Sequence, residues 1–244
     1  DVIAKLEIKV DAEMVPDNIK DKVERAVFKF KKHPSVIKIK DKIQSNDKFH
    51  LKECSLGEIV TTINKLNKKK PTTFDNVPAK IIVEYQDICS KYIHHFYNDS
   101  ISKSIFPYPL KMADITPVHK KDDKSMKENY RPVSILSSFS KIFEKIIYDD
   151  ISKYMEDKLS PYLCGFRKGF STQYCMIIML EIWKKALDNK NIAGALLTDL
   201  SKAFDSLNHE LLIAKLDAYG FNHNSLTLML NYFSGRKQRT KINN

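Results

Sequence analysis

Apolar side chains recur every three or four residues through much of this chain, a spacing typical of amphipathic helices. One helix begins at a capping-box sequence, Ser55-Leu-Gly-Glu58, and places Ile59, Ile63 and Leu66 on one face. The predicted helices cover residues 18–30, a segment from 55, a long segment after the turn at 73–79, 140–159, 172–187, a segment containing 211–219, and 225–233.

The long helix after the turn has a predicted core stripe of Ile81, Ile82, Tyr85, Ile88, Cys89, Tyr92 and Phe96. The adjacent His94 and His95 would project from this helix in different directions. They make a poor chelating pair, so we expect them to face solvent or to be hydrogen-bonded.

Strand patterns occur at three places. Residues 112–119 predict a strand that leads into a polar hairpin tip at 120–124 and returns over 129–135. Residues 192–200 are a short apolar run, which predicts a buried strand. Residues 35–40 alternate and are followed by further lysines, so a strand and a Lys-rich linker are equally compatible with them.

The composition favours a folded chain with an anionic partner. At 244 residues and 43% hydrophobic content, the chain can bury a core as one large or two small domains. Its 41 Lys and Arg against 30 Asp and Glu give a net charge of +11, which suits nucleic acid. The lysine excess also fits a compositional habit of the source genome.

Cysteine usage and hydropathy predict a soluble intracellular protein, nuclear or cytoplasmic, without a membrane segment. The four cysteines have no C-x-x-C pair and are expected to be free buried thiols in a reducing compartment. Because the sequence opens at Asp1 without a Met, we expect its N-terminus to be a break in a longer chain.

Asp199 stands near the end of the apolar run 192–200. A carboxylate there needs a cation or a hydrogen-bonding partner if it is buried, so it is a candidate metal ligand. The residues alone also allow a plainer interpretation, in which Asp199 or Asp205 caps the following helix.

A family resemblance favours the interpretation of Asp199 as a metal ligand. The sequence Asp199-x-x-x-Ala203-Phe204-Asp205 resembles the first palm motif of reverse transcriptases of non-LTR (LINE-type, jockey-like) retrotransposons. Asn129-Tyr-Arg-Pro-Val-Ser134 resembles their fingers motif. The resemblance implies an α+β fold that is helix-rich with a small, incomplete sheet. It divides the chain into an N-terminal helical or linker extension (1–54), polymerase fingers (55–190) and the first part of the palm (191–244).

The same resemblance assigns site residues. Asp199 would be catalytic and, with the Leu200 carbonyl, would bind one of two Mg²⁺ (or Mn²⁺) ions. Phosphates of a deoxynucleoside triphosphate would be held by Lys120 or Lys121 and by Arg131. Phe204 would exclude ribonucleotides, with Ala203 leaving room beside it, and Asp205 would hold the start of the next helix. RNA template and DNA primer would contact Phe166, Arg167, Lys168, Arg236 and Lys237.

Two departures limit the expected activity. Leu163 stands where the family usually has Gln, and no Asp-Asp pair follows Asp199. Because one carboxylate is too few for two ions, we expect a reverse transcriptase fragment that does not polymerise by itself, lacking the rest of the palm and the thumb. The alternatives are a non-catalytic basic RNA- or DNA-binding module and a non-functional remnant.

Overall fold

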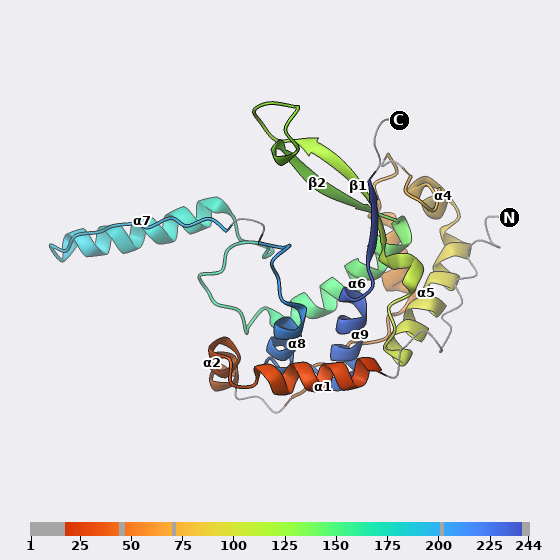
Figure 1. Cartoon of the computed structure of the whole chain (residues 1–244), viewed down its shortest axis with the longest axis horizontal. Helices are drawn as coiled ribbons and strands as arrows, with labels where there is room; N and C mark the ends of the chain where they lie inside the picture. Colours follow the sequence, from red (N-terminus) through yellow and green to blue (C-terminus); the bar gives the residue numbers. More distant parts are fainter. Residues whose placement is uncertain (1–17, 44–46, 70–71, 201–202, 241–244) are drawn as a thin grey trace. The chain divides into compact units, whose positions relative to one another are not determined.

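The computed structural model describes residues 18–43, 47–69, 72–200 and 203–240. This part of the chain is helix-rich with one small sheet, which confirms the predicted α+β class (Figure 1). Its elements are α1 (Asn18–Phe30), α2 (Pro34–Lys42), α3 (Leu56–Asn64), α4 (Ala79–Glu84), α5 (Gln86–Lys103), β1 (Met112–His119), β2 (Tyr130–Leu136), α6 (Ser138–Met155), α7 (Thr172–Asp188), α8 (His209–Ala218), α9 (His223–Phe233) and β3 (Lys237–Thr240), with 3₁₀ turns η3 (Tyr108–Lys111) and η4 (Lys127–Asn129).

The chain divides into two compact units. The larger unit comprises Asp1–Lys153 and Asn208–Asn244, and the smaller unit comprises Tyr154–Leu207. In the described residues, no helix is both long enough and apolar enough to cross a membrane.

Most helix predictions are confirmed. The capping box at the start of α3 is formed: the Ser55 hydroxyl accepts from the Glu58 amide at 3.3 Å, and the Glu58 carboxylate accepts from the Ser55 amide at 2.7 Å. Gly220 follows α8 with a φ of 94°, a conformation that glycine adopts without the steric penalty of a Cβ. Helix α8 itself is capped by Asn208, so the plainer interpretation, in which Asp199 or Asp205 caps this helix, was wrong.

Residues 35–40 are neither a strand nor a linker, because they form part of α2. Pro34 occupies the first turn of α2, where its fixed φ is favourable and its missing N–H is not needed. His33 caps the helix by accepting from the Ser35 amide at 3.3 Å. Burial of Val36 against Ala214 and Ala218 of α8 outweighs the alternating pattern.

The long helix predicted after Ala79 is interrupted at Tyr85, whose φ of −105° and ψ of 34° separate α4 from α5. This break shifts the buried face of α5, which consists of Cys89, Ser90, Ile93, Tyr97 and Ser100. Three residues of the predicted stripe are therefore exposed instead: Tyr85, Ile88 and Tyr92.

Three strands form a sheet in the order β2-β1-β3. The antiparallel β1–β2 pair is the predicted hairpin, whereas β3 pairs in parallel with β1, with Asp114 opposite Arg239. The basic segment after α9 is thus itself a strand. The Asp114 side chain is 4% exposed and accepts from the Arg239 guanidinium at 2.5 Å, so an ion pair joins β3 to β1.

An aromatic cluster lies in the core of the larger unit. The Phe143 ring of α6 lies edge-on to Tyr97 at 5.3 Å and to Phe106 at 6.2 Å between ring centroids, and Phe106 contacts Tyr232 at 4.9 Å. The Asn231 side-chain carbonyl accepts from the Phe106 amide at 3.0 Å and from the Lys111 ammonium at 2.8 Å. These contacts join α5, α6 and α9.

The predicted strand at 192–200 is not formed. Residues 191–200 have no regular structure, and Ile192, Leu196 and Leu197 are more than four-fifths exposed. An apolar run becomes a strand only where neighbouring strands satisfy its backbone groups and cover its side chains. Among the described residues, no strand pairs with this segment.

Candidate functional site

The β1–β2 hairpin projects from the helices of the larger unit and carries three of the predicted nucleotide-binding residues (Figure 1). Val118 on β1 lies opposite Arg131 on β2, and the Lys120 amide extends the ladder by donating to the Asn129 carbonyl at 2.7 Å. Because side chains alternate along a strand, Lys120 and Arg131 lie on one face with the half-exposed Val118 and Val133. Lys121 follows beyond the ladder.

The hairpin tip is held by its own hydrogen bonds. The Asp123 carbonyl accepts from the Asn129 side-chain amide at 2.8 Å, and its carboxylate accepts from the Ser125 amide at 2.9 Å. The hydrogen bond to the Ser125 backbone lowers the pKa of Asp123. The Tyr130 hydroxyl donates to the Lys124 carbonyl at 2.9 Å. The tip is therefore an ordered turn that presents two exposed lysines at its start.

The residues of the palm-like motif lie in the smaller unit and are exposed. Asp199 and Leu200 belong to the segment without regular structure, and Ala203 and Phe204 belong to a turn at 203–206. The Phe204 ring is 79% exposed and lies edge-on to the ring of Phe166, with 6.3 Å between the centroids. The structure thus brings together two predicted site residues that are far apart in sequence, Phe166 and Phe204.

Arg167 anchors the loop on which Phe166 lies. Its guanidinium donates to Glu156 at 2.6 Å and to the Ser160 carbonyl at 3.0 Å, and it stacks on the Phe170 ring at 4.2 Å. Its side chain is 9% exposed. Arg167 therefore orders the loop, while Phe166, which has a positive φ of 60°, and Lys168 are exposed.

Arg236 and Lys237 also differ in their surroundings. The Arg236 guanidinium donates to Glu144 at 3.5 Å and lies over the Tyr232 ring at 4.6 Å. The Tyr232 hydroxyl donates to the same carboxylate at 2.9 Å, and burial raises its pKa to about 12. Lys237 is exposed, and a hydrogen bond to Tyr108 raises its pKa.

The donor set near Asp199 does not fit a two-ion centre. In residues 18–43, 47–69, 72–200 and 203–240, no group of three His, Cys, Asp or Glu side chains is placed to hold a metal ion. A pair of hard cations needs more carboxylate oxygen ligands than one exposed aspartate supplies.

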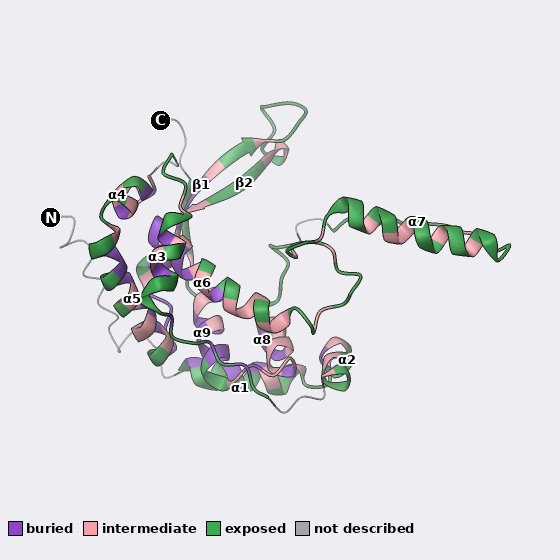
Figure 2. Cartoon of the chain, turned by 180° about the vertical axis from the view of Figure 1, so that it is seen from behind, coloured by how far each residue is buried: buried purple, intermediate pink, exposed green. Residues whose placement is uncertain are grey.

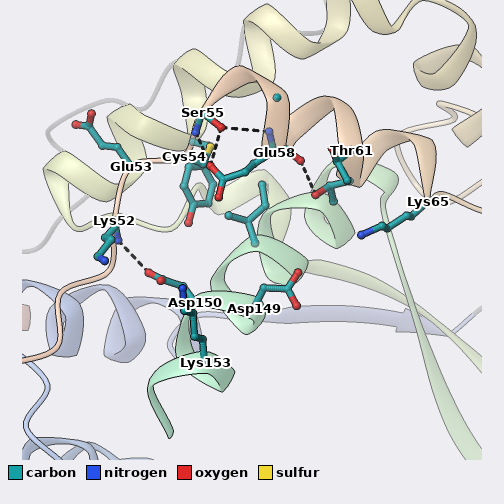
Figure 3. A pocket seen from close by; sticks show the side chains of 14 residues that line it. Lys52, Glu53, Cys54, Ser55, Glu58, Thr61, Lys65, Asp149, Asp150 and Lys153 are labelled. Atoms are coloured by element: carbon teal, nitrogen blue, oxygen red, sulfur yellow. Dashed lines mark hydrogen bonds between the residues drawn. The ribbon is translucent and has the colours of Figure 1, made fainter. Parts of the chain in front are cut away.

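A cavity of about 660 Å³ in the larger unit lies between α3 and α6 (Figure 3). Its wall includes Lys52, whose amide donates to Asp150 at 3.2 Å, and Cys54, whose pKa burial raises to about 12. Desolvation raises the pKa of Asp150. None of the predicted site residues lines this cavity. The sequence signal for it was the Asp149-Asp150 pair, which by itself indicates only a charged helix surface.

A family model described as reverse transcriptase (RNA-dependent DNA polymerase) matches residues 118–244, which contain every predicted site residue. The chain belongs to the reverse transcriptase family. Within that family, its relatives include proteins of Drosophila non-LTR transposons, among them jockey, which confirms the resemblance.

Three relatives illustrate the similarity. The "Probable RNA-directed DNA polymerase from transposon BS" of Drosophila melanogaster is 33% identical over 170 residues, 68% of this chain and 19% of that protein. The corresponding protein from transposon X-element of the same species is 29% identical, covering 64% of this chain and 17% of the relative. The RNA-directed DNA polymerase from mobile element jockey of the same species is 27% identical, covering 68% of this chain and 18% of the relative. The chain spans about a fifth of the length of these reverse transcriptases.

Proposed function

We propose that this chain supplies the fingers and the first part of the palm to a retrotransposon reverse transcriptase that copies RNA into DNA. The observation that carries the proposal is the hairpin face on which Lys120 and Arg131 lie together. An ammonium and a guanidinium on one projecting arm suit the phosphates of a deoxynucleoside triphosphate, because charge-assisted hydrogen bonds are strong and directional. Lys121 is a third cation at the tip, and the apolar Val118 and Val133 beside them suit a nucleoside.

The proposed division keeps residues 1–54 as an extension, 55–190 as fingers and 191–244 as the start of the palm. Asp199 is the proposed catalytic carboxylate, and it would share a Mg²⁺ or Mn²⁺ ion with the Leu200 carbonyl. Phe204 is the proposed discriminator against ribonucleotides, with Ala203 beside it. Enzymes of this family generally use such ions. The remaining ligands of the ion would have to be carboxylates other than those of the described residues.

The nucleic-acid contacts follow the exposed side chains. Phe166 offers an aromatic face to a base, and Lys168 and Lys237 offer charges to phosphates of the RNA template or the DNA primer. Arg167 and Arg236 act mainly as positioning residues, because each already pairs with a glutamate. With these partners, we propose that the protein acts inside the cell, in the nucleus or the cytoplasm.

Nucleotide binding tests the hairpin. We expect the double variant Lys120→Ala/Arg131→Ala to bind a fluorescent deoxynucleoside triphosphate with an affinity at least about tenfold lower than that of the wild type, since two charge-assisted contacts are lost. The double variant Lys20→Ala/Arg25→Ala, on exposed positions of α1, removes the same charge elsewhere. An equal loss in both double variants would show that net charge, not the hairpin face, binds the nucleotide.

Primer extension tests the catalytic part. With an RNA template, a DNA primer and Mg²⁺, we expect these 244 residues alone to add no nucleotides. Measured extension would contradict the argument that Asp199 lacks the carboxylate partners it needs.

A second function, non-catalytic binding of RNA or DNA, is favoured by the net charge of +11 and by Asp199 being the single candidate metal-binding carboxylate of the palm segment. It predicts binding to an RNA–DNA hybrid that weakens steeply with salt, needs no Mg²⁺ and is unchanged in Asp199→Asn. Loss of binding in Asp199→Asn, or a Mg²⁺ requirement, would favour the polymerase fragment. Absence of any binding would favour a non-functional remnant.

A further inference from the structure

The loop between α6 and α7 is folded back onto the first turn of α7. Arg167 stacks on Phe170, and the Phe170 ring lies edge-on to Tyr174 with 5.0 Å between centroids. The Ser171 hydroxyl accepts from the Tyr174 amide at 3.3 Å, and the Ser171 carbonyl accepts from the Cys175 amide at 3.2 Å. These contacts fix the start of α7 against the loop.

Two of the four cysteines meet at this fold. Cys164 lies in the loop and Cys175 in the first turn of α7, and their side chains share a hydrogen bond. The Cys164 thiol also donates to the Tyr162 carbonyl at 3.6 Å, and both cysteines are partly exposed. A small oxidant can therefore reach two thiols that are already neighbours.

The other two cysteines form a natural contrast. Cys54 and Cys89 are buried in the larger unit, and burial raises the pKa of both thiols, Cys54 to about 12. The pKa of Cys164 is raised as well, by desolvation and by the neighbouring Cys175, so the contrast lies in access: an oxidant can reach the partly exposed pair, whereas the two buried thiols are covered.

We propose that Cys164 and Cys175 are a redox modification site that forms a reversible disulfide within the chain. One thiolate attacks a low-molecular-weight disulfide such as oxidised glutathione, forms a mixed disulfide and releases one glutathione. The second cysteine then attacks the mixed disulfide and releases another glutathione. The two electrons and two protons of the pair thereby pass to two glutathione molecules.

The bond would close a ring that contains Phe166 and Lys168. Oxidation would therefore restrict the exposed part of the loop without altering the core of the larger unit. If the nucleic-acid contacts proposed above are correct, this restriction acts on them, but the disulfide itself does not depend on that function.

The test uses the full 244-residue chain, equilibrated with oxidised glutathione, alkylated in denaturant and digested with trypsin. Arg167 and Lys168 lie between the two cysteines, so cleavage there leaves two peptides joined only by the disulfide. Mass spectrometry should find these peptides linked, lighter by two hydrogens than the reduced pair, with Cys54 and Cys89 alkylated. Reduction should separate them.

Variants make the assignment specific. Cys164→Ser and Cys175→Ser should each abolish the linked peptides, whereas Cys89→Ser, with an unchanged circular dichroism spectrum, should retain them. The proposal is overturned by a disulfide that includes Cys54 or Cys89, by a disulfide between two chains, or by glutathione adducts that remain on Cys164 while Cys175 stays free.

Discussion

Helices α5 and α7 have similar lengths, 18 and 17 residues, but use their apolar side chains in opposite ways. Helix α5 buries five residues in the larger unit, while α7 buries none, and its Ile177, Leu180 and Ile182 are more than half exposed (Figure 2). The same contrast holds for the two units, because none of the described residues of Tyr154–Leu207 is buried.

The comparison separates two consequences of an apolar pattern. Apolar residues at helical spacing are sufficient to form a helix such as α7, because the backbone hydrogen bonds of a helix lie within the segment itself. Burial requires an opposing surface, which α5 finds in α3 and α6. The predicted palm-like segment with Asp199 has apolar residues of the kind that fill cores, yet the described residues provide no surface that covers them.

The largest expected effect is loss of a core ring in the larger unit. Phe143→Ala removes contacts with Tyr97 and Phe106 and should lower the free energy of unfolding by about 3–5 kcal/mol. Leu180→Ala, at an exposed position of α7, should change it by less than about 0.5 kcal/mol. Chemical denaturation measures both, and comparable losses would show that α7 is covered in solution.

A smaller loss is expected when the buried acceptor on α9 is removed. Asn231→Leu leaves the Phe106 amide and the Lys111 ammonium without this partner and should destabilise the larger unit by about 2–3 kcal/mol. Asn189→Ala removes an exposed hydrogen bond to the Lys185 carbonyl at the end of α7, and its effect on the same measurement should be within about 0.5 kcal/mol.

Lys111 gives the larger unit a pH dependence. Burial, followed by the charge of Arg236, lowers its pKa from 10.5 to about 8. Between these two pH values the unfolded chain binds more protons at this residue than the folded chain, so its contribution to stability rises with pH and is absent below pH 8.

The variant Lys111→Met lacks this rise in stability with pH, while its other titrating groups are the same as those of the wild type. The quantity to follow is the unfolding free energy of the wild type minus that of Lys111→Met. It should increase by about 1–2 kcal/mol between pH 7.5 and pH 10, which is less than the whole pKa shift of Lys111 would contribute. Denaturation at several pH values measures the difference. A difference independent of pH would mean that the ammonium stays charged in the folded protein.

The smallest effect compares one helix cap from each unit. Ser55 and Ser171 both accept from the amide three residues ahead at 3.3 Å, but only Ser55 has the reciprocal bond from its capping box. Ser55→Ala should reduce stability by about 1 kcal/mol, because the start of α3 is coupled to the core. Ser171→Ala should leave global unfolding unchanged and speed hydrogen exchange only in the first turn of α7. Equal effects on global unfolding would show that the two units unfold together.

The sequence by itself determined the features that depend on local chemistry. Caps, breakers and periodicity located α1, α3, α6, α7, α8 and α9, and the β1–β2 hairpin followed from a strand, a polar tip and a returning strand. The ordered motifs around Arg131 and Asp199 identified the family, because they need only residue identity at fixed spacing.

Only the tertiary structure decided which apolar and charged residues have partners. It made 35–40 a helix through the contact of Val36 with α8, interrupted the long helix at Tyr85, and paired Arg167 and Arg236 with glutamates. It also left 192–200 without a strand and set Cys164 beside Cys175. These outcomes depend on groups distant in sequence or on the exact path of the backbone, and neither can be obtained from local spacing because burial and pairing are properties of two surfaces.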